Sequence, residues 1–599
     1  MLQLGRRSFS SVVLVDFEFH APDGERPQPI CAVFLELPSR RTIRLKRDEL
    51  VTRSSPPFST GADTLWVAFY ASAEWGCFRA LGWSLPTSTV DLFAEHRVET
   101  NGLALGTGDG LLGALTCRGL SAMETATKDE MRAVAMRGGP FTAAEMDALV
   151  DYCEQDVVAL ERLFDAMKPR LDGERALLRG QYMKEVAAIE WRGVPTDVAT
   201  LVALREHWST VRLGLVERLD RGFGVYDGCT FKVTRFERYL ETRGIPWPRL
   251  ESGGLSLEED TFSEMALSYP EIQPLRELRN VLAKLRLEKL AVGSDGRNRT
   301  LLSPFRSITG RNQPSTSRSI FGGAAWLRSL VKPEPGTALA YLDWGQQEFG
   351  IGAALSRDEN MMAAYLSADP YLAFARQAGA VPDGATAESH PNERALFKTC
   401  SLGVLYGIGV ARLARNVGRS EFEARALLTA HRKAYRRFWA WIGGAMDVAF
   451  LERELRLGLG WRVHVTATTR PPSIQNFPMQ GTGSEMLRLA CIYAANDGVD
   501  IVMPVHDAVL IEAPIADLDG AIFRAHRAMA RASRDLLDGF ELRTDSTTVV
   551  APDRYRDKRG ATMWATVMGL LADIPGVGGV AGSFTGAATG TRQEEKEEK

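Results

Sequence analysis

Short apolar runs separated by turn residues dominate the first part of the chain. Residues 11–15, 30–37 and 65–70 are rich in β-branched and other apolar side chains, as half-buried strands are. Apolar positions then recur at helical spacing over residues 142–163. Strands followed by helices predict a layered α/β domain over about residues 1–170.

The remainder of the chain changes character several times. Residues 171–300 show mainly helical patterning, and residues 293–318 are rich in Gly, Ser, Thr, Asn and Arg, which predicts irregular chain. A second region of mixed strands and helices follows over residues 338–552. Residues 576–599 are rich in Gly, Ala and Thr and end in a charged run, which cannot bury enough apolar surface to fold. We therefore expect a disordered tail.

Composition and charge narrow the class of protein. The chain has 599 residues, 45% hydrophobic and 25% charged, as expected of a multidomain globular protein. Its 72 Lys and Arg against 75 Asp and Glu exclude a uniformly basic coat protein, but not an enzyme with a basic cleft. The 7 cysteines form no CxxC pair, which disfavours zinc and disulfide scaffolds. No apolar run reaches roughly 18 residues and no cleavable signal is evident, so we expect an intracellular, cytoplasmic protein.

Two acids stand at the end of the first apolar run. Asp16 and Glu18 lie two positions apart, so strand alternation directs both side chains to the same face. Converging carboxylates repel each other unless a cation lies between them, and hard divalent ions take such oxygen ligands. On the later helix, Tyr152 and Asp156 are spaced by one turn and share a face.

Two similar acid positions occur in the C-terminal half. Residues 338–342 form an apolar strand that ends at Asp343, and Glu348 follows five residues later, where a helix is expected to begin. Apolar runs also flank His506 and Asp507, which predicts a tight hairpin with an acid at its tip.

Between these acids in the sequence lies a predicted helix with basic, apolar and aromatic side chains along one face. Steps of four place one stripe of side chains along a helix: Arg394, Lys398, Leu402 and Tyr406. Two cations followed by an apolar and an aromatic residue suit a triphosphate at one end and a sugar with its base at the other.

Taken together, these segments resemble motifs A, B and C of the family A DNA polymerases. Residues 309–311 and 475–481 also resemble segments that contact the primer–template in that family. The resemblance covers about residues 10–570 and implies a right-hand polymerase domain after the first domain. Its expected parts are a thumb over about 171–300, a palm over about 301–360 and 470–575, and fingers over about 361–469.

The N-terminal acids resemble those of the DEDD-type 3′–5′ exonucleases, which have an RNase H-like fold. Asp16, Glu18 and Asp156 match the pattern, and Tyr152 would orient the attacking water. The remaining acid is Glu74, although Tyr70 stands where Asn is usual, and Asp91 is a competing candidate for the role. The resemblance implies a proofreading domain over residues 1–170.

The resemblance also implies cofactors and site residues. Each active site would hold two Mg²⁺ ions, replaceable by Mn²⁺, with Asp343 and Asp507 as ligands in one site and Asp16, Glu18, Asp156 and Glu74 in the other. Arg394 and Lys398 would neutralise phosphates. The other dNTP-binding residues would be Gln346, Glu348, Leu402 and Tyr406. The residues expected to contact DNA are Arg311, Gln475, Asn476, Gln480 and His506.

The sequence departs from the family pattern at three positions. Ala508 replaces the Glu that normally follows the motif C aspartate, and Leu402 replaces an aromatic residue against the sugar. Pro472 stands where an Arg is usual, a change for which Arg470 could compensate.

The function expected is template-directed DNA synthesis with proofreading, acting on primer–template DNA and dNTPs. A single-subunit RNA polymerase is the nearest alternative, and Glu348 argues against it because its bulk would crowd a ribose 2′-hydroxyl. A catalytically silent DNA-binding protein is the other alternative. The absence of a 5′-nuclease segment resembles phage enzymes, so we expect replication of a phage genome, with a helicase, primase or processivity factor as possible partners.

Overall fold

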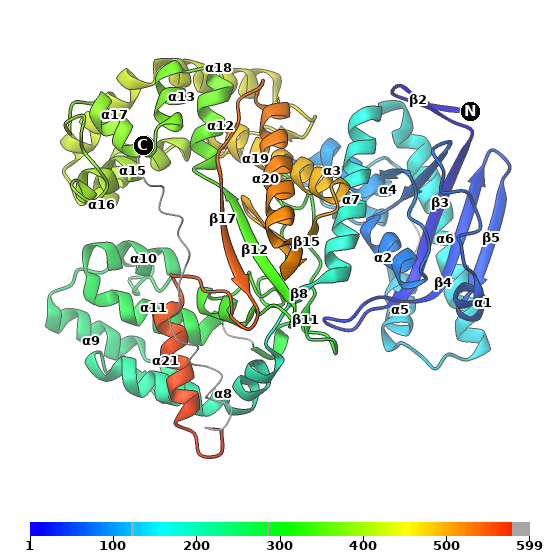
Figure 1. Ribbon diagram of the computed structural model, residues 1–599, viewed down its shortest axis with the longest axis horizontal. Helices are drawn as coiled ribbons and strands as arrows, with labels where there is room; N and C mark the ends of the chain where they lie inside the picture. The colour runs from blue at the N-terminus through cyan, green and yellow to red at the C-terminus, as the bar shows by residue number, and fades with distance from the viewer. Residues whose placement is uncertain (121–124, 285–286, 578–599) are drawn as a thin grey trace. The chain divides into compact units, whose positions relative to one another are not determined.

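The computed structural model describes residues 1–120, 125–284 and 287–577, and most of the expected tail lies outside them. The chain divides into two compact units (Figure 1). The first comprises Met1–Val194, Ala291–Ser315 and Thr337–Thr548, and the second comprises Pro195–Leu290, Thr316–Gly336 and the chain from Val549 onward. Among the described helices, none combines the length and apolar character needed to cross a bilayer.

The first unit begins with a mixed 5-stranded sheet in the order β5-β4-β3-β6-β7. Its strands are β3 (Ser11–His20), β4 (Gln28–Leu37), β5 (Arg41–Lys46), β6 (Thr64–Ala68) and β7 (Ser88–Asp91). The neighbours β3, β4 and β5 run antiparallel, whereas β6 is parallel to both β3 and β7. The strands expected from the sequence are thus confirmed.

Helices cover this sheet and complete the layered α/β arrangement. The long α6 (Ala143–Met167) packs on β3 and β4, and α2 (Ser72–Ala80) packs on β3. Val12 and Leu14 join the core beneath α6. Because side chains alternate along a strand, Asp16 and Glu18 continue the face that carries Val12 and Leu14. The smaller helices of this part are α1 (Arg47–Thr52), α3 (Leu92–Thr100), α4 (Leu111–Thr116) and α5 (Thr125–Arg137).

A 4-stranded sheet in the order β15-β16-β12-β17 forms the centre of the C-terminal part of the first unit (Figure 1). Its strands are β12 (Thr337–Trp344), β15 (Asp500–Val505), β16 (Ala508–Pro514) and β17 (Thr544–Val550). The register of β12 and β16 places Asp343 opposite Ala508. Two long helices, α19 (Pro471–Asn496) and α20 (Leu518–Leu536), pack against each other, and α20 also contacts β12.

Helices fill the segment between β12 and α19. They are α12 (Gln347–Ser356), α13 (Glu359–Leu366), α14 (Pro370–Gln377), α15 (Pro391–Leu405), α16 (Val410–Val417), α17 (Glu421–Ala434) and α18 (Arg436–Glu452), followed by the short hairpin β13 (Glu454–Arg456) and β14 (Arg462–His464). Aromatic side chains pack around His431, whose ring is buried, and this burial lowers its pKa to about 3. His431 is therefore a neutral core residue.

The second unit is mainly helical. Its helices are α8 (Val198–Leu219), α9 (Val233–Arg243), α10 (Glu259–Ser268), α11 (Gln273–Lys284) and α21 (Ala561–Ala572). The C-terminal α21 packs on α8, and ion pairs join Arg554 to Asp197 and Arg328 to Asp557.

Two segments group differently in the two compact units than in the expected thumb and palm. The helix α7 (Gly173–Arg192), which the sequence assigned to the thumb, packs on β7 and α2 in the first unit. Residues 549–575, assigned to the palm, belong to the second unit. Apolar periodicity predicts a buried helix face without showing which element covers that face.

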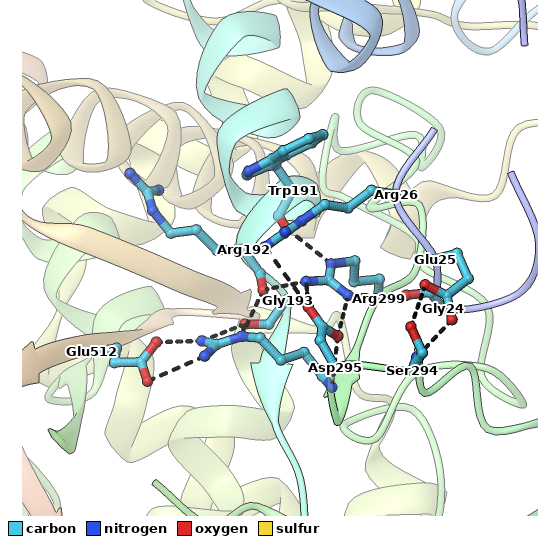
Figure 2. A network of polar contacts seen from close by, with 11 residues as sticks. Gly24, Glu25, Arg26, Trp191, Arg192, Gly193, Ser294, Asp295, Arg299 and Glu512 are labelled. Atoms are coloured by element: carbon cyan, nitrogen blue, oxygen red, sulfur yellow. Dashed lines mark hydrogen bonds and ion pairs between the residues drawn. The ribbon is translucent and has the colours of Figure 1, made fainter. Parts of the chain in front are cut away.

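A polar network links the N-terminal sheet to strand β16 through residues 294–299 (Figure 2). The guanidinium of Arg299 donates to the carbonyls of Gly24 (3.1 Å) and Trp191 (2.9 Å) and forms an ion pair with Asp295. Arg297 forms an ion pair with Glu512 on β16. The N–H of Ser294 donates to Glu25 at 2.6 Å, so this short segment is bound on both sides.

Candidate active sites

Three acids converge at the end of β3 in the N-terminal sheet. Asp16, Glu18 and Asp156 each offer a carboxylate oxygen, and these oxygens lie within 4.8 Å of one another. Asp156 comes from α6 and is buried. The packing of α6 on β3 thus brings together residues that are far apart in the sequence. An all-oxygen set of this kind suits Mg²⁺ or Mn²⁺.

Glu74, on α2, faces the same cluster. Its side chain is buried at 4% exposure, and burial, followed by the charges of Asp16 and Glu18, raises its pKa well above the usual range. The Phe17 N–H donates a hydrogen bond to its carboxylate. A buried acid whose ionised form is opposed by neighbouring carboxylates would be stabilised by a bound cation.

Asp91, the competing candidate, occupies a different place. Its Oδ1 accepts hydrogen bonds from the N–H groups of Tyr70 and Phe93, both at 2.9 Å, and its Oδ2 accepts from Ala71 at 3.2 Å. Asp91 is the N-cap of α3 and also binds the chain just before α2. Burial raises its pKa to about 7, although these hydrogen bonds act in the opposite direction.

The two tyrosines singled out in the sequence, Tyr152 and Tyr70, make different contacts. Tyr152 makes a side-chain hydrogen bond with Asp156, one helical turn away, and its pKa is raised by burial and by that carboxylate. Tyr70, at the position where Asn was expected, adopts a positive φ of 68°. Its hydroxyl makes a side-chain hydrogen bond with Ser303, and its ring packs on Phe93 with centroids 5.1 Å apart. The side chain of Tyr70 therefore packs against the 302–306 region.

The 4-stranded sheet, at the position expected for the palm, brings together the two C-terminal acids expected from the sequence. Asp343 lies near the end of β12, and Asp507 lies at the tip of the β15–β16 hairpin, where the Trp344 N–H donates to the Asp507 carbonyl at 3.2 Å. Burial, followed by the charges of Asp507 and Asp545, raises the pKa of Asp343 to about 6. The acid on β17, Asp545, was not identified from the sequence.

The helix with the expected mixed stripe is confirmed as α15, and Tyr406 is its C-cap. Arg394 forms an ion pair with Asp369, the N-cap of α14. The ring of Tyr371 lies 5.8 Å from the guanidinium carbon of Arg394 and 5.9 Å from the Lys398 Nζ. One aromatic ring and one carboxylate thus position the cationic end of the stripe.

Glu348 is the centre of a hydrogen-bonded group at the other end of the stripe. Its Oε1 accepts from the Tyr406 hydroxyl at 2.9 Å and forms an ion pair with Arg311 at 3.4 Å. Gln480 in turn donates to the Tyr406 hydroxyl at 2.9 Å. Tyr406 and Arg311 thus both bind the Glu348 carboxylate, and four residues from four separate segments are brought together.

Gln475 and Asn476 bind the end of α15. The Gln475 amide donates to the carbonyl of Val404 at 2.7 Å, and the Asn476 amide donates to that of Leu405 at 3.1 Å. These are carbonyls of the last helical turn, which have no partner within the helix. The amides therefore fix α15 to α19, a contact that the DNA-binding expectation did not include.

The remaining expected residues lie around this site. Gln346 precedes α12 in a left-handed conformation (φ 48°) and accepts from Arg543 at 3.0 Å. Leu402 is half-buried on α15. His506 is exposed at the hairpin tip, with φ 55°.

Comparison with known proteins identifies relatives of this arrangement. Residues 311–544 match the model of DNA polymerase family A. DNA polymerase I of Chloroflexus aurantiacus is 26% identical over 66% of this chain, and the thermostable DNA polymerase I of Thermus thermophilus is 27% identical over 59%. The chain spans 46% of the length of each of these relatives.

One solved structure shares the fold over most of the chain. It is the POL domain of Pol1 from M. smegmatis in complex with DNA primer-template and dNTP, with a TM-score of 0.66 and 18% identity. The match covers 92% of this chain and 96% of that chain. The family match includes Asp343, Asp507 and the whole of α15. Residues 311–544 are thus similar to DNA polymerase family A.

Proposed function

We propose that this chain is a template-directed DNA polymerase that adds dNTPs to a primer 3′-end. The observation that carries the proposal is the convergence of Asp343, near the end of β12, and Asp507, at the tip of the β15–β16 hairpin, within the segment that matches the family. The relatives' names and the primer-template and dNTP in the structural neighbour support the same substrates.

The carboxylates fit a site for divalent cations. Asp343 is partly buried, and a neighbouring negative charge opposes its ionisation, which is the situation that a bound cation relieves. Asp343 and Asp507 would hold two Mg²⁺ ions, or Mn²⁺ in their place. When bound, such ions lower the pKa of the attacking hydroxyl and neutralise charge on the transferring phosphoryl group.

The chain's own residues supply positioning and charge. Arg394 and Lys398 would bind the triphosphate, because a guanidinium forks onto phosphate oxygens and an ammonium adds a point charge. Glu348, held by Tyr406, would lie where the incoming sugar binds and exclude a 2′-hydroxyl. Arg311 and Gln480 suit the minor-groove acceptors, which are similar in all base pairs.

A second activity, 3′–5′ exonuclease proofreading, is proposed for the N-terminal sheet. It is favoured by the convergence of Asp16, Glu18 and Asp156 at the end of β3, with Glu74 directed at the same cluster. The layered α/β sheet is compatible with the RNase H-like fold expected from the sequence. We assign Glu74, rather than Asp91, as the remaining acid, because the oxygens of Asp91 accept backbone hydrogen bonds.

The biological setting extends this proposal. The sequence favours replication of a phage genome, whereas the relatives named above are bacterial DNA polymerases. A helicase, primase or processivity factor remains an expected partner. A single-subunit RNA polymerase is the alternative enzyme, and substrate choice separates it from a DNA polymerase.

One assay with the full chain tests these proposals. A labelled primer annealed to a longer template is incubated with Mg²⁺ and dNTPs, with Mg²⁺ and NTPs, and with Mg²⁺ alone. We expect extension with dNTPs, little extension with NTPs, and shortening of the primer when nucleotides are omitted. Extension only with NTPs would favour the RNA polymerase, and no extension with either would overturn the polymerase proposal. A primer that stays intact without nucleotides would overturn the exonuclease proposal.

A further inference from the structure

The strand that carries Asp343 has different neighbours on its two sides. The sheet order is β16-β12-β17, so β12 is flanked by β16 on one side and by β17 on the other. On β16, Ala508 lies directly opposite Asp343 and is fully buried. This is the position at which the family pattern has a Glu, so β16 offers no carboxylate opposite Asp343.

An acid is present on the β17 side instead. The Asp545 Oδ2 lies 3.7 Å from the point where a Cβ on Gly345 would be, and the Gly345 N–H donates to the Arg543 carbonyl at 2.9 Å. β12 ends at Trp344, so Gly345 lies in the turn that follows the strand. The Asp545 carboxylate therefore lies beside this turn, two residues along the chain from Asp343.

Thr544, the neighbour of Asp545 in the sequence, indicates on which face of β17 the Asp545 side chain lies. The Thr544 hydroxyl is 2.6 Å from the Nδ1 of His526, a residue of α20, so Thr544 points to the helix-covered face. Alternation along β17 then directs Asp545 to the opposite, open face. Asp545 is exposed, and no Lys or Arg in the part of the chain that the structure describes forms an ion pair with it.

We propose that Asp545 is a third carboxylate of the polymerase metal site and takes the place of the acid that Ala508 lacks. The inference rests on the proposed polymerase function. Two aspartates oppose only part of the charge of two divalent cations, and a third carboxylate brings the site closer to balance. The acid has moved from one strand next to β12 to the other, while the family's two aspartates remain.

Electrostatics agree with this placement. The pKa of Asp343 is raised to about 6 by burial, by Asp507 and then by Asp545, which shows that the Asp545 charge acts on Asp343. A carboxylate that repels Asp343 without a compensating cation is unfavourable in the metal-free protein. A bound divalent cation reverses the sign of this contribution.

Binding of Mn²⁺ tests the proposal without relying on activity. Every protein carries Asp16→Ala to weaken the exonuclease cluster, and free Mn²⁺ is measured by electron paramagnetic resonance during titration with a dideoxy-terminated primer–template bound. Asp545→Asn should weaken Mn²⁺ binding by about 10-fold or more, on the scale of losses around metal sites. Asp545→Glu should retain most of the affinity. Asp519→Asn, an exposed acid of α20, is the matched control and should bind normally.

The outcomes separate this inference from the function on which it rests. Asp507→Asn is measured in parallel as a variant of a core ligand. Loss of Mn²⁺ binding in Asp507→Asn with unchanged binding in Asp545→Asn would overturn the role of Asp545 and leave the polymerase proposal intact. Equal weakening in Asp545→Asn and Asp519→Asn would also overturn it, because it would indicate a general charge effect. The polymerase proposal itself would be overturned by two results together. The Asp16→Ala protein would not extend primers, and adding Asp507→Asn to it would not weaken Mn²⁺ binding.

Discussion

The two carboxylate clusters of this chain are assembled by different structural means. In the N-terminal sheet, two acids lie on one strand, and helices packed on the sheet bring the others, so Asp156 and Glu74 are both buried. In the palm sheet, the three acids Asp343, Asp507 and Asp545 belong to different strands or their connecting turn, and Asp545 is exposed. Helix packing positions the first cluster, and strand order and register position the second.

This difference indicates how each site tolerates change. A cluster built by packing depends on the core beneath α6, where Val12 and Leu14 lie. A cluster built by register can exchange one strand for its neighbour as the source of a ligand, since adjacent strands are only about 4.8 Å apart. The contrast predicts that acids in the N-terminal sheet are individually indispensable, and that acids of the palm sheet differ in importance.

The largest expected effect is the separation of the two activities. Asp507→Ala should reduce primer extension by about 10³-fold or more and leave 3′-end degradation intact, and Asp16→Ala should do the reverse, because each removes a charge from only one cluster. Extension and degradation of one labelled primer measure both effects. Loss of both activities from either change, in a protein with normal circular dichroism, would contradict two independent sites.

The next effect distinguishes the two buried acids of the N-terminal domain. Glu74→Gln should reduce nuclease activity by about 10²-fold, as Asp156→Asn should, because each removes a charge from the cation site. Asp91→Asn should lower the melting temperature more than the nuclease rate, since one amide N–H would face a backbone N–H. Nuclease rates and thermal unfolding of the three variants decide the matter. If Asp91→Asn lost nuclease activity and Glu74→Gln kept it, the assignment would be reversed.

Sugar selection should belong to the palm cluster alone. Glu348→Ala removes the acid held by Tyr406, so the preference for dNTP over rNTP should fall by about 10- to 100-fold, measured as the ratio of kcat/KM. Excision of a 3′-terminal ribonucleotide should not change. Glu421→Ala, an exposed acid of α17, serves as the control. An unchanged ratio in Glu348→Ala would show that sugar selection lies elsewhere.

The smallest expected effect is on stability and has a defined pH dependence. The pKa of Asp343 is raised to about 6 in the folded protein, above its ordinary value. The ionised carboxylate therefore lowers the free energy of unfolding by its full amount above about pH 6, and this destabilisation disappears toward pH 4. In EDTA, Asp343→Asn should raise the melting temperature by ~1–4 °C at pH 7.5 and by less at pH 5. Differential scanning fluorimetry measures both. A lower melting temperature at pH 7.5 would mean that the metal-free carboxylates do not repel each other.

Much of the polymerase site could be predicted from local patterns. The strand ending at Asp343, the hairpin around Asp507 and the helix carrying Arg394 and Lys398 are confirmed, because each is a strongly patterned segment with its polar residues at the functional end. The N-terminal strands were predictable for the same reason. Local pattern decides such elements when apolar alternation or helical periodicity is clear.

The remaining features depend on contacts between distant segments. Asp545 belongs to a strand whose first five residues are not buried, so no alternation marks it, and only the sheet order places it beside Asp343. Tyr70 was identified as an unusual residue, but its bond with Ser303 is a tertiary contact. The amides of Gln475 and Asn476 bind carbonyls of α15, which sequence spacing does not indicate.

The buried cations around α7 have a consequence for the evolution of this protein. Arg179 pairs with Glu95 through a buried ion pair, and the Lys184 ammonium donates to the carbonyls of Pro86 and Thr87 at 2.9 and 3.0 Å. All of these partners lie within residues 1–170. Arg179 also donates to the Leu459 carbonyl at 3.2 Å, outside that segment. Deletion of residues 1–170 would remove the other partners of both cations and would expose the face of α7 that packs on β7 and α2, which is more costly than losing one carboxylate. If the proposed exonuclease activity were no longer needed, a lineage would be expected to inactivate Asp16 or Asp156 by point mutation and to keep the N-terminal domain as a structural part of the protein.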